Sequence, residues 1–203
     1  LTATGGAFNV NQLLNAAHVL GLGIETDLEV LLSDNFRIIA NASYNDTEID
    51  DPDLRDDLCG SSPTCTGLDP VVGSRVGPFG PVTEVSIDGN PLPRTPNWLA
   101  NLIMQYDMPM QSGGTLYVNT DWNYRSESNI FLHRSLEFVA EQRTLGGVRV
   151  GYRGSSDKWD AAIVGRNITN EIVVDGALNF LNRTAFVNEP RYWGVEFRYD
   201  FSN

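Results

Sequence analysis

Apolar and polar side chains alternate one by one near the end of this chain, and this alternation restricts the fold more than any other feature. The odd positions form an apolar row made of Trp193, Val195, Phe197, Tyr199 and Phe201. The even positions between them are Gly194, Glu196, Arg198 and Asp200. Because successive side chains of a strand point to opposite faces, we predict a β-strand with one apolar and one charged face. It is long enough to cross a membrane as a tilted strand.

The same period of two recurs upstream in six further segments. Four alternate clearly, at 20–31, 36–47, 98–108 and 115–125, and two less cleanly, at 143–153 and 159–169. No stretch sustains a helical period for about three turns, and no apolar run approaches the roughly 18 residues of a membrane helix. The sequence therefore predicts an all-β chain of about seven strands.

The connections between these segments alternate strictly between short and long. The short turns lie at 33–35, 109–114 and 154–158. The long connections lie at roughly 46–96, 126–141 and 170–190. This segregation is typical of outer-membrane barrels, in which one rim carries tight turns and the other carries extended external loops. We predict an antiparallel up-and-down transmembrane β-barrel segment, and its odd strand number and abrupt start indicate part of a larger barrel. By itself it should form an open curved sheet with a bare edge strand near residues 18–31. Aromatic residues near both ends of the strands predict two belts at the membrane interfaces.

Charge and cysteine content narrow the possible partners. The formal net charge of −12 disfavours nucleic acid, because phosphate binding needs clustered Lys and Arg. Cys59 and Cys65 are the only cysteines, and a close pair in a loop predicts a disulfide formed in an oxidising compartment. The alternative is a metal site, which lacks further ligands in the sequence. His18 and His133 are far apart, and the spacing matches no zinc pattern, so we predict no metal site.

Five short motifs follow one another along nearly the whole chain. They are Asn15-Ala16-Ala17 with Gly23-Ile24-Glu25, Leu32 to Tyr44, Leu92 to Trp98, Arg166 to Glu171, and Glu189 to Phe201. Together they resemble, in order, the C-terminal barrel half of TonB-dependent receptors. The resemblance implies that residues 1–203 belong to the C-terminal part of a plugged barrel of about 22 strands. The plug domain and the earlier strands are not in this sequence.

The resemblance also implies a function and a set of partners. An outer-membrane receptor of this family takes up a scarce ligand (an iron–siderophore, haem, cobalamin or a sugar) with energy from the inner membrane. The implied partners are outer-membrane lipid, the plug domain, the inner-membrane TonB complex acting through that plug, the barrel assembly machinery, and a small ligand such as a metal chelate. The row from Trp193 to Phe201 would form the strand read by the assembly machinery. Family members commonly end on that aromatic residue, whereas Ser202 and Asn203 follow it here.

Ligand contact is expected on the external loops and the upper lumen wall. The candidate residues are Asn123 and Arg125, which face inward by alternation, and His133, Arg134 and Arg143 in or beside the next loop. Arginine there suits an anionic ligand group, although the same side chains can instead hydrogen-bond neighbouring strands or the plug. The acidic segment 46–57 is expected to be a solvated loop, with a Ca²⁺ site as the alternative.

Catalysis has little support in the sequence, although outer-membrane barrels can be enzymes. No nucleophile elbow, zinc-protease signature or phosphate loop occurs, so we expect neither an enzyme nor a cofactor. Two other classes remain open. One is a soluble, secreted β-sandwich binding module with a loop disulfide. The other is a small structural outer-membrane barrel, which the odd strand number disfavours because bacterial single-chain barrels use even numbers.

Overall fold

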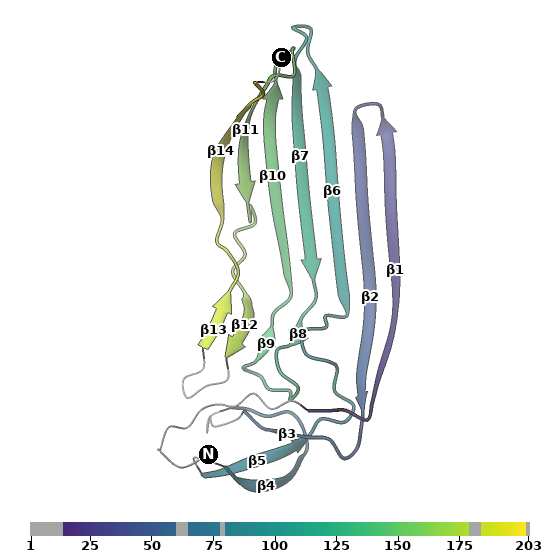
Figure 1. The fold of residues 1–203 in the computed structure, drawn as a ribbon, viewed down its shortest axis with the longest axis vertical. Helices are drawn as coiled ribbons and strands as arrows, with labels where there is room; N and C mark the ends of the chain where they lie inside the picture. The colour runs from purple at the N-terminus through teal and green to yellow at the C-terminus, as the bar shows by residue number, and fades with distance from the viewer. Residues whose placement is uncertain (1–13, 60–64, 78–79, 179–183, 202–203) are drawn as a thin grey trace.

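The computed structural model describes residues 14–59, 65–77, 80–178 and 184–201. The main element is one large antiparallel sheet of seven strands, which stands upright in Figure 1 with smaller sheets below it. Nowhere in these four ranges is there a helix long and apolar enough to cross a membrane. Ser202 and Asn203, which follow the final aromatic residue, lie outside the described residues.

All seven predicted strands are present in the large sheet. In hydrogen-bonded order they are β1 (His18–Ser33), β2 (Phe36–Asp50), β6 (Trp98–Pro109), β7 (Thr115–Arg125), β10 (Arg143–Arg153), β11 (Trp159–Arg166) and β14 (Tyr192–Tyr199). Each strand pairs only with its predecessor and successor in this order, as an up-and-down topology requires. The described part of the chain does not close into a barrel, because β1 and β14 stand at opposite edges of the sheet. The predicted open sheet, with a bare edge strand near residues 18–31, is confirmed.

The long connections contain small sheets that the sequence analysis did not predict. The first connection forms β3 (Arg55–Asp57), β4 (Val71–Gly77) and β5 (Gly80–Ser86), the second forms β8 (Ser128–Asn129) and β9 (Val139–Ala140), and the third forms β12 (Val174–Leu178) and β13 (Thr184–Val187). Five of these strands have only two to five residues, too few for alternation to reveal them. The other two, β4 and β5, have seven residues each and contain glycine or proline, which typically marks a turn. In Figure 1 all three connections leave the lower end of the large sheet, and the short turns lie at its upper end.

The strand register gathers apolar side chains on one face of the sheet. One row across the middle of the sheet runs through Leu28, Ala40, Leu102, Trp122 and Gly146. The neighbouring row on the opposite face runs through Asp27, Asn41, Asn101, Asn123 and Leu145. Because a slip of one residue would exchange the two faces, this register fixes which residues meet lipid if the sheet spans a membrane.

The apolar face has no covering layer among the described residues. On this face Ile24 is 66% exposed, Ile163 56% and Val195 81%. A single large aliphatic side chain left in water forfeits roughly 1.5–3 kcal/mol of transfer free energy. An uncovered row of such side chains across seven strands therefore calls for an apolar environment outside the sheet.

Aromatic pairs lie at both ends of the apolar face. At the turn end the ring centroids are 6.0 Å apart in the pair Phe36–Tyr106 and 5.5 Å apart in the pair Tyr152–Trp159. At the loop end the pair Tyr44–Trp98 has a centroid distance of 4.9 Å. Tyr and Trp prefer the two interfaces of a bilayer because their rings carry both apolar and polar groups. The two predicted aromatic belts are thus formed by contacts between neighbouring strands.

The opposite face of the sheet carries paired charges. Asp160 on β11 is 4% exposed and accepts hydrogen bonds from the Tyr117 hydroxyl and from Arg149 Nη2, both at 2.8 Å. The Arg149 guanidinium also donates to the Tyr117 hydroxyl at 3.0 Å and forms an ion pair with Glu196. A charge removed from water is tolerated when it is paired and hydrogen-bonded. This face is therefore a polar wall built to face an enclosed or wet space.

We expect the two faces to respond differently to a new charge at adjacent positions of β6. Leu102→Arg puts a guanidinium in the middle of the apolar face and is expected to cost about 2–4 kcal/mol of stability in a bilayer. Ile103→Arg is the matched control, because Ile103 points to the polar face and pairs in register with Asp121. It is expected to cost less than about 1 kcal/mol. Urea unfolding in lipid vesicles measures both, and equal costs would contradict the assigned faces.

Candidate functional site

The three long connections pack against one another around their own apolar clusters. One cluster consists of Cys59, Ile130, Phe138, Ala140 and Ala177, which come from all three connections. A second consists of Ile49, Val85 and Ile87. Every member of both clusters is at most 5% exposed. The loop end is therefore a packed layer with its own core, which holds the polar side chains near it in defined positions.

Two of the predicted ligand-contact residues meet at the loop end of the polar face. Arg125, the last residue of β7, and Arg143, the first residue of β10, are register partners. Asp175 on β12 bridges them: its Oδ1 lies 2.5 Å from Arg125 Nη1, and its Oδ2 lies 2.9 Å from Arg143 Nη1. Both arginine side chains are less than 20% exposed. One carboxylate thus ties the β12–β13 hairpin to the ends of two wall strands.

The two arginines determine the ionisation of Asp175. Burial by itself would raise the pKa of this carboxyl group, because water no longer solvates the charged form. Hydrogen bonds from Arg125 and Arg143, together with their positive charges, outweigh burial and hold the pKa of Asp175 below its ordinary value of 3.8. The carboxylate therefore stays ionised and bound to the arginines throughout the neutral pH range.

A cavity of about 620 Å³ adjoins this bridge, between the wall strands and the β12–β13 hairpin. Among the residues that line it are Asp121, Asn123, Arg143, Arg166, Asp175 and Tyr192. Small-ligand sites commonly measure roughly 300–1,000 Å³. Charges of both signs face the cavity, and Arg166 Nη1 lies 2.8 Å from Asp121 Oδ1. This polar cavity is the best-formed candidate site for a small, charged ligand.

The other predicted contact residues are distributed differently. Asn123 lines the cavity and donates to Asn101 Oδ1 at 2.6 Å. Arg134 is in the second connection, where its Nε donates to Asp69 Oδ1 at 2.7 Å. His133 is buried beside the cysteine pair. The structure therefore brings Asn123, Arg125 and Arg143 together and leaves His133 and Arg134 in the packed loop layer. The sequence analysis missed Asp175, because nothing near it marks it as the partner of two arginines distant in the chain.

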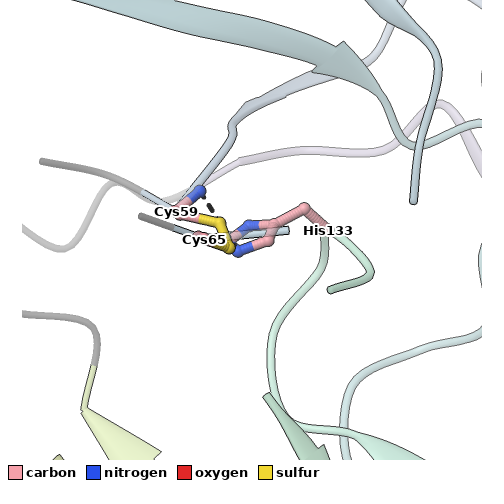
Figure 2. A group of neighbouring side chains, drawn as sticks. All are labelled: Cys59, Cys65 and His133. Carbon is pink, nitrogen blue, oxygen red and sulfur yellow. Dashed lines mark hydrogen bonds between the residues drawn. A yellow bond between two sulfur atoms is a disulfide. The ribbon is translucent and has the colours of Figure 1, made fainter. Parts of the chain in front are cut away.

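Cys59 and Cys65 are joined by a disulfide bond, and His133 lies against it (Figure 2). The side-chain ligand atoms of these three residues all lie within 4.8 Å of one another. The sequence analysis expected no histidine beside the cysteine pair, and this expectation is wrong. The second connection folds back over the first and brings His133 to the disulfide. Local spacing patterns do not detect a histidine delivered by another loop.

The described carboxylates of the acidic segment 46–57 do not come together at metal-like spacing. Among the residues that the structure describes, the cysteine–histidine group is the one set of three or more His, Cys, Asp or Glu side chains with metal-like spacing. The oxygens of Asp51 instead accept hydrogen bonds from the backbone amides of Ala17 and Asp53, at 2.8 and 3.2 Å. These carboxylate oxygens thus hold the local backbone, and nothing in this arrangement supports the Ca²⁺ alternative.

Comparisons with known proteins identify the fold. No protein-family model matches the sequence, and no curated protein matches it either. Solved structures match by shape. The ferric yersiniabactin uptake receptor FyuA from Yersinia pestis superposes with a TM-score of 0.68 at 14% identity, covering 93% of this chain and 24% of that chain. The chain has the fold of a receptor β-barrel wall.

Two further receptors support the same conclusion. The siderophore receptor PiuA from Acinetobacter baumannii has a TM-score of 0.62 at 17% identity, covering 88% of this chain and 21% of that one. BauA, the ferric preacinetobactin receptor from the same organism, has a TM-score of 0.57 at 18% identity, with coverages of 89% and 22%. The resemblance to the barrel of TonB-dependent receptors is confirmed at the level of fold. The chain spans about a fifth to a quarter of each receptor's length.

We expect Asp175→Asn to loosen the β12–β13 hairpin. Asparagine keeps the shape but loses the charge that two arginines bind, which is expected to cost on the order of 1 kcal/mol after allowance for partial exposure. Amide hydrogen exchange of Val174–Leu178 should quicken about 5-fold at neutral pH. Asp34→Asn, in a turn at the opposite end of the sheet, is the matched control. Unchanged exchange in Asp175→Asn would show that the bridge does not hold the hairpin.

The same bridge predicts a pH dependence. Because folding lowers the pKa of Asp175, its contribution to stability is present above the unfolded-state pKa of about 3.9 and is lost as the pH falls through the lower folded-state pKa. Hairpin exchange in the unaltered protein, corrected for the intrinsic pH dependence of exchange, should therefore quicken below about pH 3.9. In Asp175→Asn this acid-induced step is expected to be absent, and an identical step in both proteins would assign it to another group.

Proposed function

We propose that this chain is the C-terminal wall of an outer-membrane receptor that takes up a scarce ligand with energy supplied by the inner membrane. The observation that carries the proposal is the seven-stranded sheet whose uncovered apolar face ends in aromatic pairs, with all long connections at one rim. The match to three receptors over about nine-tenths of the chain supports it. The plug domain and the remaining barrel strands would lie in the rest of such a receptor.

An iron–siderophore complex is the proposed ligand class. Haem, cobalamin and sugars are the other classes that the sequence resemblance allows. The names of the similar receptors refer to ferric yersiniabactin, to a siderophore and to ferric preacinetobactin, which favours a ferric chelate. Such chelates commonly present carboxylate or phenolate oxygens, and arginine suits these anionic groups. The cavity beside Arg143 is the proposed contact region, with Asn123 and Arg125 as further contact residues.

The two faces of the sheet fit the proposed partners. Outer-membrane lipid would cover the apolar face, and the plug would contact the polar wall around Arg149, Asp160 and Glu196. The TonB complex would act through that plug. The barrel assembly machinery would read the last strand and its apolar row, Trp193, Val195, Phe197, Tyr199 and Phe201.

The soluble β-sandwich is the second candidate, and the exposure of the apolar face argues against it. A sandwich covers the apolar face of one sheet with another about 10 Å away. The small sheets of this chain gather at the loop end, and Val195 is 81% exposed. A small closed barrel is disfavoured because β1 and β14 lie at opposite edges of the sheet.

Cell fractionation combined with iron uptake tests the proposal. The full receptor is expected in the outer-membrane fraction, and its deletion should abolish uptake of at least one radiolabelled ferric siderophore. Uptake should also stop when the proton-motive force is collapsed. Recovery of the protein in the soluble fraction, folded without detergent, would reject the membrane assignment.

Substitution of Arg143 tests the proposed contact region. Arg143→Ala removes a guanidinium that lines the cavity, and the loss of a charge-assisted hydrogen bond is expected to weaken ligand binding about 10–100-fold. Arg75→Ala is the matched control, because Arg75 pairs with Asp57 in the loop sheet and does not line the cavity. Equal ligand affinities of both variants in equilibrium binding would place the site elsewhere.

A further inference from the structure

The buried imidazole of His133 lies beside the disulfide Cys59–Cys65, although a purely structural disulfide needs no histidine next to it. His133 is 4% exposed, and Cys59 is 1% exposed. A buried imidazole is a polar group whose desolvation must be offset by hydrogen bonds. An apolar side chain would fill the same place without that cost. The cost calls for an explanation in the chemistry of these three residues.

The hydrogen bonds of His133 fix which ring nitrogen carries the proton. The backbone N–H of Cys59 lies 3.3 Å from Nε2 and can only donate, so Nε2 accepts. In the neutral ring the proton therefore sits on Nδ1, which donates to Asp56 Oδ2 at 2.8 Å. A carboxylate behind Nδ1, with an unprotonated Nε2, is the arrangement that orients histidine ligands of metal ions. The imidazole ring lies directly beside the two cysteines (Figure 2).

The surroundings of the cluster are largely apolar. The His133 ring stacks on Phe131, with centroids 5.7 Å apart and planes 18° apart, and meets Phe138 edge-on at 6.4 Å. Cys59 belongs to the apolar cluster that joins the three connections, and Cys65 packs against it. An apolar shell strengthens the attraction between a cation and its ligands, because it lowers the local dielectric constant.

We propose that Cys59, Cys65 and His133 form a redox-gated site for a thiophilic cation such as Zn²⁺, closed as the disulfide and open to the metal as the dithiol. A tetrahedral zinc ion with bonds of about 2.3 Å to sulfur and about 2.0 Å to nitrogen holds these ligands roughly 3.5–3.8 Å apart. The ligand atoms already lie within 4.8 Å of one another, so small side-chain rotations suffice. Asp56 stays on Nδ1 as the positioning residue, and a water molecule completes the coordination.

The gating step is a thiol–disulfide exchange. Two molecules of a small thiol reduce the Cys59–Cys65 bond, giving two cysteine thiols and one small-molecule disulfide. Binding of the divalent cation then displaces one proton from each thiol, and Nε2 of His133 donates its lone pair. The Cys59 amide gives up its hydrogen bond to Nε2 in this step. The metal joins the first long connection to the second. Exchange with a small-molecule disulfide reverses the step: it oxidises the two cysteine thiolates to the Cys59–Cys65 bond, is itself reduced to two molecules of small thiol, and releases the cation.

Cobalt binding by the full receptor in detergent tests the site, because Co²⁺ in a thiolate site gives charge-transfer absorption. The receptor is reduced with a small thiol, freed of the thiol under argon, and titrated with CoCl₂. One equivalent of Co²⁺ with thiolate absorption is expected in the reduced protein, and none in the oxidised protein. Cys65→Ser should abolish this absorption. Equal absorption by the reduced protein and Cys65→Ser would overturn the proposal.

Substitutions at the imidazole distinguish a metal ligand from a structural hydrogen bond. His133→Gln is expected to weaken Co²⁺ binding more than 100-fold, and His18→Gln, the only other histidine, should leave it unchanged. In Asp56→Asn the amide oxygen still accepts a hydrogen bond from Nδ1–H of His133, so the fold should persist. The affinity for Co²⁺ should nevertheless fall about 10-fold or more, because the carboxylate charge is lost. Wild-type affinity in either His133→Gln or Asp56→Asn would overturn the site as described. These readouts do not depend on ligand uptake, so they stand or fall separately from the receptor function.

Discussion

The structure depends on the antiparallel hydrogen-bond ladder that joins the seven strands. Inside a bilayer no water is present to satisfy a backbone amide or carbonyl, so a spanning chain must pair all of these groups internally. Six successive strand pairs do this between β1 and β14. The outer edges of those two strands have no partner in the large sheet, and in the proposed receptor further strands of the barrel pair with them.

The chain distributes its apolar residues between two different environments. In the sheet, large side chains such as Val195 and Ile163 are exposed on one face, and no side chain within the described ranges covers them. In the loop layer, Ile49, Val85 and Ile87 are at most 1% exposed. Lipid can stabilise the first group, whereas the second group excludes water in the ordinary way of a soluble core. The loop layer is therefore able to hold a site rigidly even though it consists of connections.

An ion pair links this layer to the wall, and a side-chain hydrogen bond links two of its connections. The bridge from Asp175 to Arg125 and Arg143 places a charged hairpin over the polar cavity, and the pair Asp56–His133 joins two connections beside the disulfide. Both links join residues from different connections, or from a connection and a wall strand. A ligand or a metal that competes for one of these groups would therefore act on the position of a whole loop, because each link holds two elements together.

The sequence by itself determined the seven wall strands, their two faces and the segregation of loops, because alternation with a period of two is a local property that survives any environment. It also placed Asn123 and Arg125 on the polar face near the long connections, and Arg143 in or beside one of these connections. Only the tertiary structure decided that Asp175 bridges two of these residues and that His133 lies against the cysteine pair. Those contacts join residues that loops bring together from distant positions, and short, irregular loop segments have no periodic pattern from which the contacts can be inferred.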